Sequence, residues 1–162
     1  MKFADVIGNG SVADALVSMA DSGRVAHAML LYENEGSGAL ALALAYVQYL
    51  NCSNPHDGDS CGECPSCRQM SKLIHPDVHF VFPVIKKKKS SSDSAPISDD
   101  YITEWRELLS KSAYFSYDDW LQKLDVDNQQ PMIYERESSE ILHKLSMQSR
   151  EGGWKIVIIW LP

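Results

Sequence analysis

Three short apolar runs divide the chain, at positions 27–32 (HAMLLY), 78–84 (VHFVFPV) and 154–160 (WKIVIIW). Each run is nearly continuous and does not alternate with polar residues, which is typical of strands buried on both faces. Glycines next to the first and third runs, at 36, 38, 152 and 153, supply turn signals. The pattern therefore predicts three buried strands.

Apolar residues between these runs recur at spacings of three and four, which predicts helices. The first helix is expected to begin with Ser11 as its N-cap and to end near Gly23. The second covers 39–50 and is apolar almost all round, so it should be buried. Further helices are expected over 97–110, with Ser98 as its cap, and over 118–124.

The last predicted helix covers 135–150. Its apolar stripe consists of Ile141, Leu142 and Leu145, and Glu140 is placed to form an ion pair with Lys144 one turn later. Strands that alternate with helices predict an α/β fold, in which helices cover both faces of a parallel sheet. Three strands make a small sheet, and the chain stops two residues after the third run, so we expect a truncated domain, a fragment of a longer protein.

The composition narrows the function classes without naming one. Of the 162 residues, 44% are hydrophobic and 23% charged, which is ordinary for a globular domain. The apolar stretch 39–50 is too short to span a bilayer, and the N-terminus lacks a signal-peptide pattern, so we expect a cytoplasmic protein without membrane contact. The net charge of −7 argues against a general nucleic-acid coat protein.

All four cysteines lie close together in the sequence, with the spacing C-x8-C-x2-C-x2-C, at Cys52, Cys61, Cys64 and Cys67. A C-x2-C step lets two thiolates converge on one ion, and four thiolates complete the tetrahedral shell of zinc. Since four protein ligands leave no open position, such a zinc ion would be structural. The spacing therefore predicts a structural Zn²⁺ module over 52–67.

Other interpretations of the cysteines remain open. Four thiolates also suit an iron–sulfur cluster, and a redox dithiol would use only two of them. His56 or His75 could replace a thiolate, although an exposed loop position for His56 and a turn position for His75 are the simpler interpretations.

The segment ENEGSGAL (33–40) begins like a phosphate-binding loop between a strand and a helix. A functional loop reads G-x-x-x-x-G-K-[ST], in which lysine reaches the terminal phosphates and the hydroxyl binds magnesium. When Gly38 is aligned with the second glycine, Ala39 takes the lysine position and Leu40 the hydroxyl position. Gly36 remains as a turn residue, while Glu33 and Glu35 add negative charge. ATP is therefore not expected to bind.

The low-complexity segment 86–97 (KKKKSSSDSAPI) predicts a flexible loop. Its lysines could contact phosphates, but isolated charge runs are usually solvated.

Several of these segments together resemble one family, the clamp-loader subunits of bacterial DNA polymerase III. The resemblance is carried by GRVAHAMLLY (23–32), GSG (36–38), YLNC (49–52), CGECPSCRQM (61–70) and HPDVHF (75–80). In that family a strand, phosphate loop and helix precede a four-cysteine zinc module within a P-loop NTPase-like (AAA+) domain. The resemblance therefore implies that residues 1–162 form an N-terminal AAA+-like domain.

Within this family, Ala39 and Leu40 resemble the delta-prime members, whose loop is often degenerate, more than the ATPase members, tau and gamma. The strand that normally ends in Asp-Glu, the Walker B motif, here ends in Trp160 and Leu161. The resemblance implies a non-catalytic subunit without ATPase activity that joins tau/gamma and delta in a hetero-pentamer. Through that complex it would act on the sliding clamp and primed DNA.

Two alternatives stay open at this point. The chain could be a tau/gamma-type ATPase with unusual loop chemistry, or a stand-alone zinc module that binds nucleic acid. Only Arg68 and Lys72, beside the cysteines, favour the second alternative.

Overall fold

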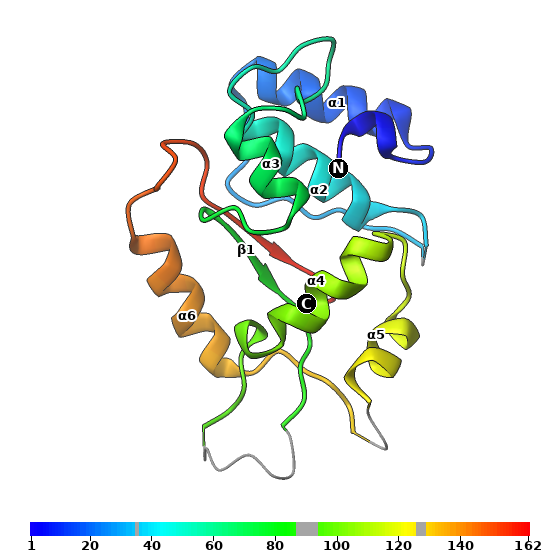
Figure 1. Ribbon diagram of the computed structural model, residues 1–162, viewed down its shortest axis with the longest axis vertical. Helices are drawn as coiled ribbons and strands as arrows, with labels where there is room; N and C mark the ends of the chain where they lie inside the picture. Colours follow the sequence, from blue (N-terminus) through cyan, green and yellow to red (C-terminus); the bar gives the residue numbers. More distant parts are fainter. Residues whose placement is uncertain (35, 87–93, 126–128) are drawn as a thin grey trace.

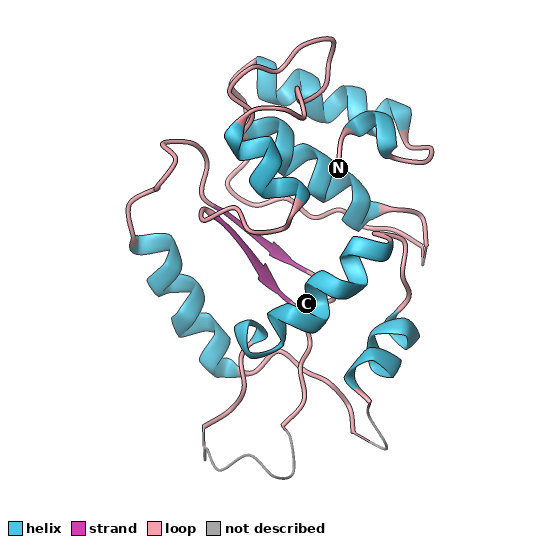
Figure 2. Ribbon diagram, viewed as in Figure 1, coloured by secondary structure: helices cyan, strands magenta, loops and turns pink. Residues whose placement is uncertain are grey.

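The structure, a computed structural model, describes residues 1–34, 36–86, 94–125 and 129–162. Figures 1 and 2 show a small sheet with helices around it. In chain order the elements are η1 (Phe3–Asp5), α1 (Gly10–Asp21), α2 (Ala39–Leu50), α3 (Pro65–Ser71), β1 (Val78–Val81), η2 (Ser98–Tyr101), α4 (Ile102–Lys111), α5 (Tyr117–Leu124), α6 (Glu135–Ser146) and β2 (Ile156–Ile159).

The two strands pair in parallel, with Val78 opposite Ile156 and Val81 opposite Ile159. This confirms that the second and third apolar runs form strands of one parallel sheet. Residues 82–84 continue the buried run beyond β1, and Val84 makes an isolated antiparallel bridge to Met132. The fold is therefore α/β, with helices around a small parallel sheet.

The first apolar run does not form the predicted strand. Residues 27–32 lie outside every strand that the structure describes, and the side chains of Leu30 and Tyr32 are 79% and 89% exposed. Leu31 alone turns inward, where it packs beside Leu16 and Leu42. Apolar character indicates a tendency to be buried, but a strand also needs a neighbouring backbone with which to form hydrogen bonds. In the described ranges, β1 and β2 pair with each other.

The main core lies between the sheet, α2 and α4. Trp105 of α4 is completely buried and stacks on Phe82, with ring centroids 4.2 Å apart. Trp120 of α5 meets Trp105 edge to face, and its Nε1–H donates to the carbonyl of Pro83 at 2.8 Å. Large aromatic side chains contribute much of the apolar area buried in a core of this size.

Most of the predicted helices are present. α2 has the predicted bounds, and most of its residues are buried, as expected from its all-round apolar surface. The predicted helix over 97–110 begins as the short 3-10 turn η2 and continues as α4. For α1 the N-cap is Asn9, in the left-handed region at φ 57°, and not Ser11.

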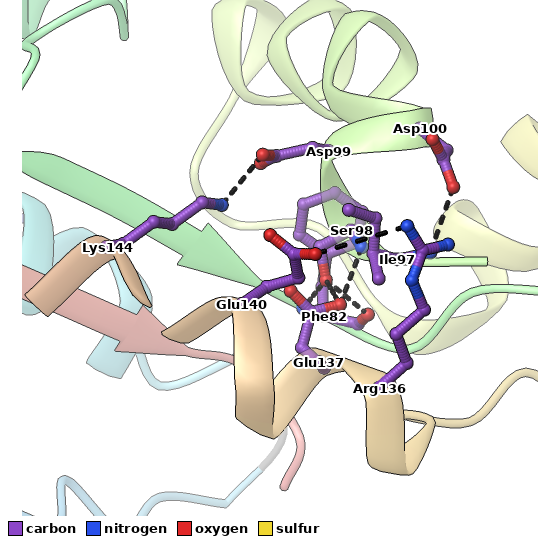
Figure 3. Close-up of polar contacts among 9 residues, drawn as sticks. All are labelled: Phe82, Ile97, Ser98, Asp99, Asp100, Arg136, Glu137, Glu140 and Lys144. Carbon is purple, nitrogen blue, oxygen red and sulfur yellow. Dashed lines mark hydrogen bonds and ion pairs between the residues drawn. The ribbon is translucent and has the colours of Figure 1, made fainter. Parts of the chain in front are cut away.

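The last helix differs from the prediction in its orientation and its length. Its predicted stripe faces outward, since Leu142 and Leu145 are 69% and 45% exposed. The buried residue of α6 is Glu137, whose carboxylate accepts the N–H of Ser98 at 2.7 Å (Figure 3). A buried backbone N–H needs an acceptor, and this requirement places a polar residue on the inner face.

The predicted pair between Glu140 and Lys144 is also wrong. Lys144 pairs with Asp99 of η2 at 2.7 Å, and Glu140 lies 4.0 Å from Arg136 on its own helix (Figure 3). The ammonium group of Lys144 thus holds α6 against η2, a contact that no spacing along α6 could predict.

The structure ends α6 at Ser146, four residues before the predicted end. The ammonium of Lys155 donates to the carbonyl oxygens of Lys144, in the last turn, and of Met147 and Gln148, just after it. A cation is favourable at this end of the helix dipole. The buried carboxylate of Asp77 then accepts the backbone N–H groups of Arg150 and Glu151, which turns the chain toward β2.

The predicted flexible loop 86–97 falls largely outside the described residues, which resume at Ser94.

Candidate functional site

The structure brings together the four cysteines that the sequence singled out. Cys52 follows Asn51, the C-cap of α2, while Cys64 is the N-cap of α3 and Cys67 lies inside that helix. Cys61 comes from the loop between them. All four Sγ atoms lie within 4.8 Å of one another.

The geometry of this cluster fits a metal better than a disulfide. The Sγ atom of Cys61 is 3.5 Å from that of Cys52 and 3.9 Å from that of Cys67, whereas a disulfide requires about 2.05 Å. A tetrahedral shell with Zn–S bonds of about 2.3 Å places neighbouring sulfurs about 3.8 Å apart. All four cysteines are free. The residues present therefore fit a four-thiolate metal site.

Backbone N–H groups point at these sulfurs, as expected for thiolates that carry negative charge. The Sγ atom of Cys61 accepts from the N–H groups of Glu63 and Cys64, at 3.4 and 3.3 Å. These two contacts lower the pKa of Cys61. Burial opposes ionisation of Cys64, yet hydrogen bonds from Ser53 and from the N–H of Cys67 lower its pKa to about 6. The chain thus prepares two of the four ligands for the thiolate form.

The two histidines considered as substitutes lie apart from the cluster. His56 is exposed and lies 3.2 Å from the carboxylate of Asp57. His75 is buried, and its Nδ1 accepts the N–H of Asp77 at 3.2 Å. Among the described residues, the group of side chains that could hold one metal ion consists of the four cysteines and contains no histidine.

The turn at residues 36–38, which we call the glycine loop, leads into a helix start that binds a carboxylate of the chain itself. Gly36 and Gly38 have φ angles of 81° and 93°, and α2 begins at Ala39. The N–H of Ala39 donates to Oε2 of Glu33 at 2.6 Å. A helix N-terminus attracts anions, and here a side chain supplies the negative charge. Glu33 is therefore an acceptor for the helix start as well as an unfavourable neighbour for phosphate.

Two other segments cover the same loop. A Cβ added at Gly38 would lie 2.7 Å from Cε1 of Tyr114, so the ring of Tyr114 lies directly against the loop. The side-chain amide of Asn9 donates to the carbonyl of Ser37 at 2.7 Å. Ile7 completes the arrangement, because its N–H donates to Oη of Tyr114 at 2.6 Å. The loop is packed from outside by residues distant in the sequence.

The end of β2 holds no acidic residue. Trp160 follows the strand and packs beside Trp105 and Phe115, with ring centroids 5.3 and 5.1 Å away. Leu161 is 46% exposed and has a φ angle of 52°. The first position of the Asp-Glu pair of the Walker B motif is thus occupied by Trp160, which belongs to the aromatic core.

The sequence did not reveal the roles of Glu33, Asn9 and Tyr114, nor that of Asp59, whose carboxylate accepts the N–H groups of Phe3 and Ala4. An acidic residue shortly before a helix start is a weak capping signal, and Glu33 has it. Asn9, Tyr114 and Asp59 act on segments 28 or more residues away, so no local pattern identifies them.

The fold and the site define an α/β domain in which a loop–helix unit leads directly into a four-cysteine cluster, while the loop lacks phosphate-binding side chains. The family model described as "DNA polymerase III, delta subunit" matches residues 8–161, and the chain belongs to this family.

Individual relatives agree with this assignment. The chain is 42% identical over 76 residues to DNA polymerase III subunit delta' of Yersinia pestis, covering 47% of this chain and 22% of that protein. It is 37% identical over 100 residues to the delta' subunit of Escherichia coli K12, covering 62% and 28%. The gamma subunit of Buchnera aphidicola is 33% identical over 114 residues, covering 70% and 28%. The predicted delta-prime resemblance is confirmed, and these matches span roughly a quarter of each relative's length.

Within the described ranges, no helix has the length and apolar character needed to cross a bilayer.

Proposed function

We propose that this chain is the N-terminal, AAA+-like domain of a non-catalytic clamp-loader subunit that supports loading of the sliding clamp during DNA replication. It would work in a hetero-pentamer with tau/gamma and delta subunits, and would meet the clamp and primed DNA through that complex. Membership of the DNA polymerase III delta family supports this role.

One observation favours a non-catalytic role over an ATPase role. The N–H of Ala39, at the position of the phosphate-binding lysine, already donates to the carboxylate of Glu33 at 2.6 Å. A triphosphate would have to displace this carboxylate without a lysine or a hydroxyl to compensate. Charge-assisted hydrogen bonds contribute roughly 1.5–3 kcal/mol each, so their loss should abolish useful ATP affinity.

The experiment is a titration of the full-length protein with Mg-ATP, followed by clamp loading with the other subunits. We expect no saturable binding below about 1 mM, no ATP hydrolysis by the isolated subunit, and clamp loading that requires its presence. Relatives named gamma and tau also match the chain, which keeps an ATPase role as the second candidate. Saturable binding with magnesium-dependent turnover would establish that role instead.

We further propose that residues 52–67 form a structural module that holds one Zn²⁺ through Cys52, Cys61, Cys64 and Cys67. Zinc supplies only the cross-link, while these residues supply the thiolates and the backbone N–H groups that hold them.

Elemental analysis of protein purified without chelator should find one zinc per chain. Cys64→Ser should lose that metal and melt at lower temperature, because a structural metal stabilises the loops that carry its ligands. Cys64→Ser with the wild-type metal content and melting curve would contradict the site. Ser53→Ala is a poor control, because Ser53 bonds Cys64. Ser139→Ala, at an exposed position of α6, is the preferable control.

A further inference from the structure

The first nine residues connect the cysteine cluster to the glycine loop. They contact the cluster through Asp59 and the loop through Asn9 and Ile7. We name residues 1–9 the N-terminal strap.

At the cluster end, one carboxylate holds two backbone groups of the strap. Asp59 lies between Cys52 and Cys61 in the sequence, and its Oδ1 and Oδ2 accept the N–H groups of Phe3 and Ala4, both at 3.0 Å. Oδ1 also accepts the N–H of Ser60 at 2.7 Å. The contact with the strap needs a carboxylate, because both oxygens act as acceptors and the amide of asparagine has only one acceptor oxygen.

A second, indirect link between the strap and the cysteine loop runs through Gln48 of α2. The ammonium group of Met1 donates to Oε1 of Gln48 at 2.9 Å, and Nε2 of Gln48 donates to Oγ of Ser60 at 2.8 Å. Gln48 and Ser60 are 2% and 0% exposed, and Ser60 immediately precedes Cys61. The start of the strap is thus linked through Gln48 of α2 to Ser60 in the cysteine loop.

At the other end, the strap closes over the glycine loop. Asn9 bonds the carbonyl of Ser37, and Ile7 bonds the hydroxyl of Tyr114, whose ring lies against Gly38. These contacts cover the loop, and they depend on where the strap is held.

We propose that the cysteine module anchors the N-terminal strap, and that metal binding at the cysteines thereby keeps the glycine loop closed. Without a shared metal, the four thiols no longer fix the loop that carries Asp59 and Ser60. The strap then loses its anchor, and Ile7 and Asn9 leave the loop more often. This inference rests on the proposed metal site, and it gives that module a role beyond local stability.

The test is amide hydrogen exchange on the zinc-loaded full chain. Asp59→Asn removes one of two acceptor oxygens with little change in shape. Asp57→Asn is the matched control, because its side chain is 97% exposed and its left-handed backbone suits asparagine. We expect exchange at the Ile7 and Ser37 amides to rise about tenfold in Asp59→Asn, and to stay within about twofold in Asp57→Asn.

A second experiment compares hydrogen exchange in the wild-type protein before and after a chelator removes the metal. If Asp59→Asn does not fold, this experiment alone tests the proposal. Faster exchange at Ile7 and Ser37, with the Trp105 amide still protected, is the expected result. Unchanged exchange at Ile7 and Ser37 in either experiment would overturn the proposal, as would equal acceleration at Trp105. Neither experiment uses nucleotide or other subunits, and metal content is measured separately, so failure here is distinct from failure of the proposed function.

Discussion

At the scale of single residues, Glu33 shows how one side chain changes the meaning of a motif. The loop keeps two glycines with positive φ angles, at positions 36 and 38, so its backbone can still turn into a helix. Gly38, the N-cap of that helix, has no side chain with which to cap it. Glu33 provides the acceptor from five residues earlier, and the loop acts as a structural turn.

We expect Glu33→Ala to lower the free energy of unfolding by about 1 kcal/mol, because Ala39 loses its acceptor and the helix start loses a favourable charge. Chemical denaturation of both proteins measures the difference. Asp14→Ala, on an exposed position of α1, removes the same charge without touching this helix start and should change stability little. Equal effects from the two variants would mean that Glu33 acts only through net charge.

At the scale of elements, α6 is held by polar contacts and leaves its leucines outside. Glu137 is 1% exposed, and its Oε2 accepts both the N–H and the hydroxyl of Ser98, at 2.7 and 3.0 Å (Figure 3). Arg136 donates to the carbonyl of Ala95 at 2.9 Å. These contacts fasten α6 to the segment that enters η2.

Glu137→Ala should lower the free energy of unfolding by about 2 kcal/mol, because it leaves the buried N–H of Ser98 without its acceptor. Glu140→Ala on the same helix removes only a partly exposed ion pair with a 4.0 Å separation, and should cost less than about 0.5 kcal/mol. Thermal or chemical denaturation compares the two. Similar losses would show that α6 is not held mainly through Glu137.

At the scale of the whole molecule, two histidines, His79 in β1 and His75 just before it, make folding sensitive to acid. Burial lowers the pKa of His75, opposed by Asp77, and burial together with Lys144 lowers the pKa of His79. Both histidines thus stay neutral in the folded protein at pH values where the unfolded chain binds protons. Stability is fully present above the unfolded pKa of about 6.5, and it is lost as the pH falls from there toward the folded values.

We therefore expect the free energy of unfolding to fall as the pH drops below about 6.5, and His79→Gln to reduce that dependence. The measurement is chemical denaturation across this range, with metal-free protein included so that proton competition at the thiols does not contribute. His27→Gln, at an exposed position, is the control variant. A slope unaffected by His79→Gln would exclude this residue as its source.

The sequence by itself determined the parts that depend on local pattern. Continuous apolar runs predicted β1 and β2, and the all-round apolar segment 39–50 predicted α2 with its observed bounds. The cysteine spacing predicted that four sulfurs would converge, because two C-x2-C steps bring ligands together within a few residues. The absence of the phosphate-binding lysine and hydroxyl, at Ala39 and Leu40, also follows from the local motif alone.

Only the tertiary structure decided which apolar segments found partners and which side of each helix faced the core. Residues 27–32 stay outside the sheet because strand pairing needs a neighbouring backbone, and α6 turns its leucines outward because a buried N–H in η2 needs Glu137. The closure of the glycine loop by Glu33, Asn9 and Tyr114 also emerged only in three dimensions. Hydrogen-bond partners distant in the sequence leave no periodic trace in it, so the pattern of residues could not predict these contacts.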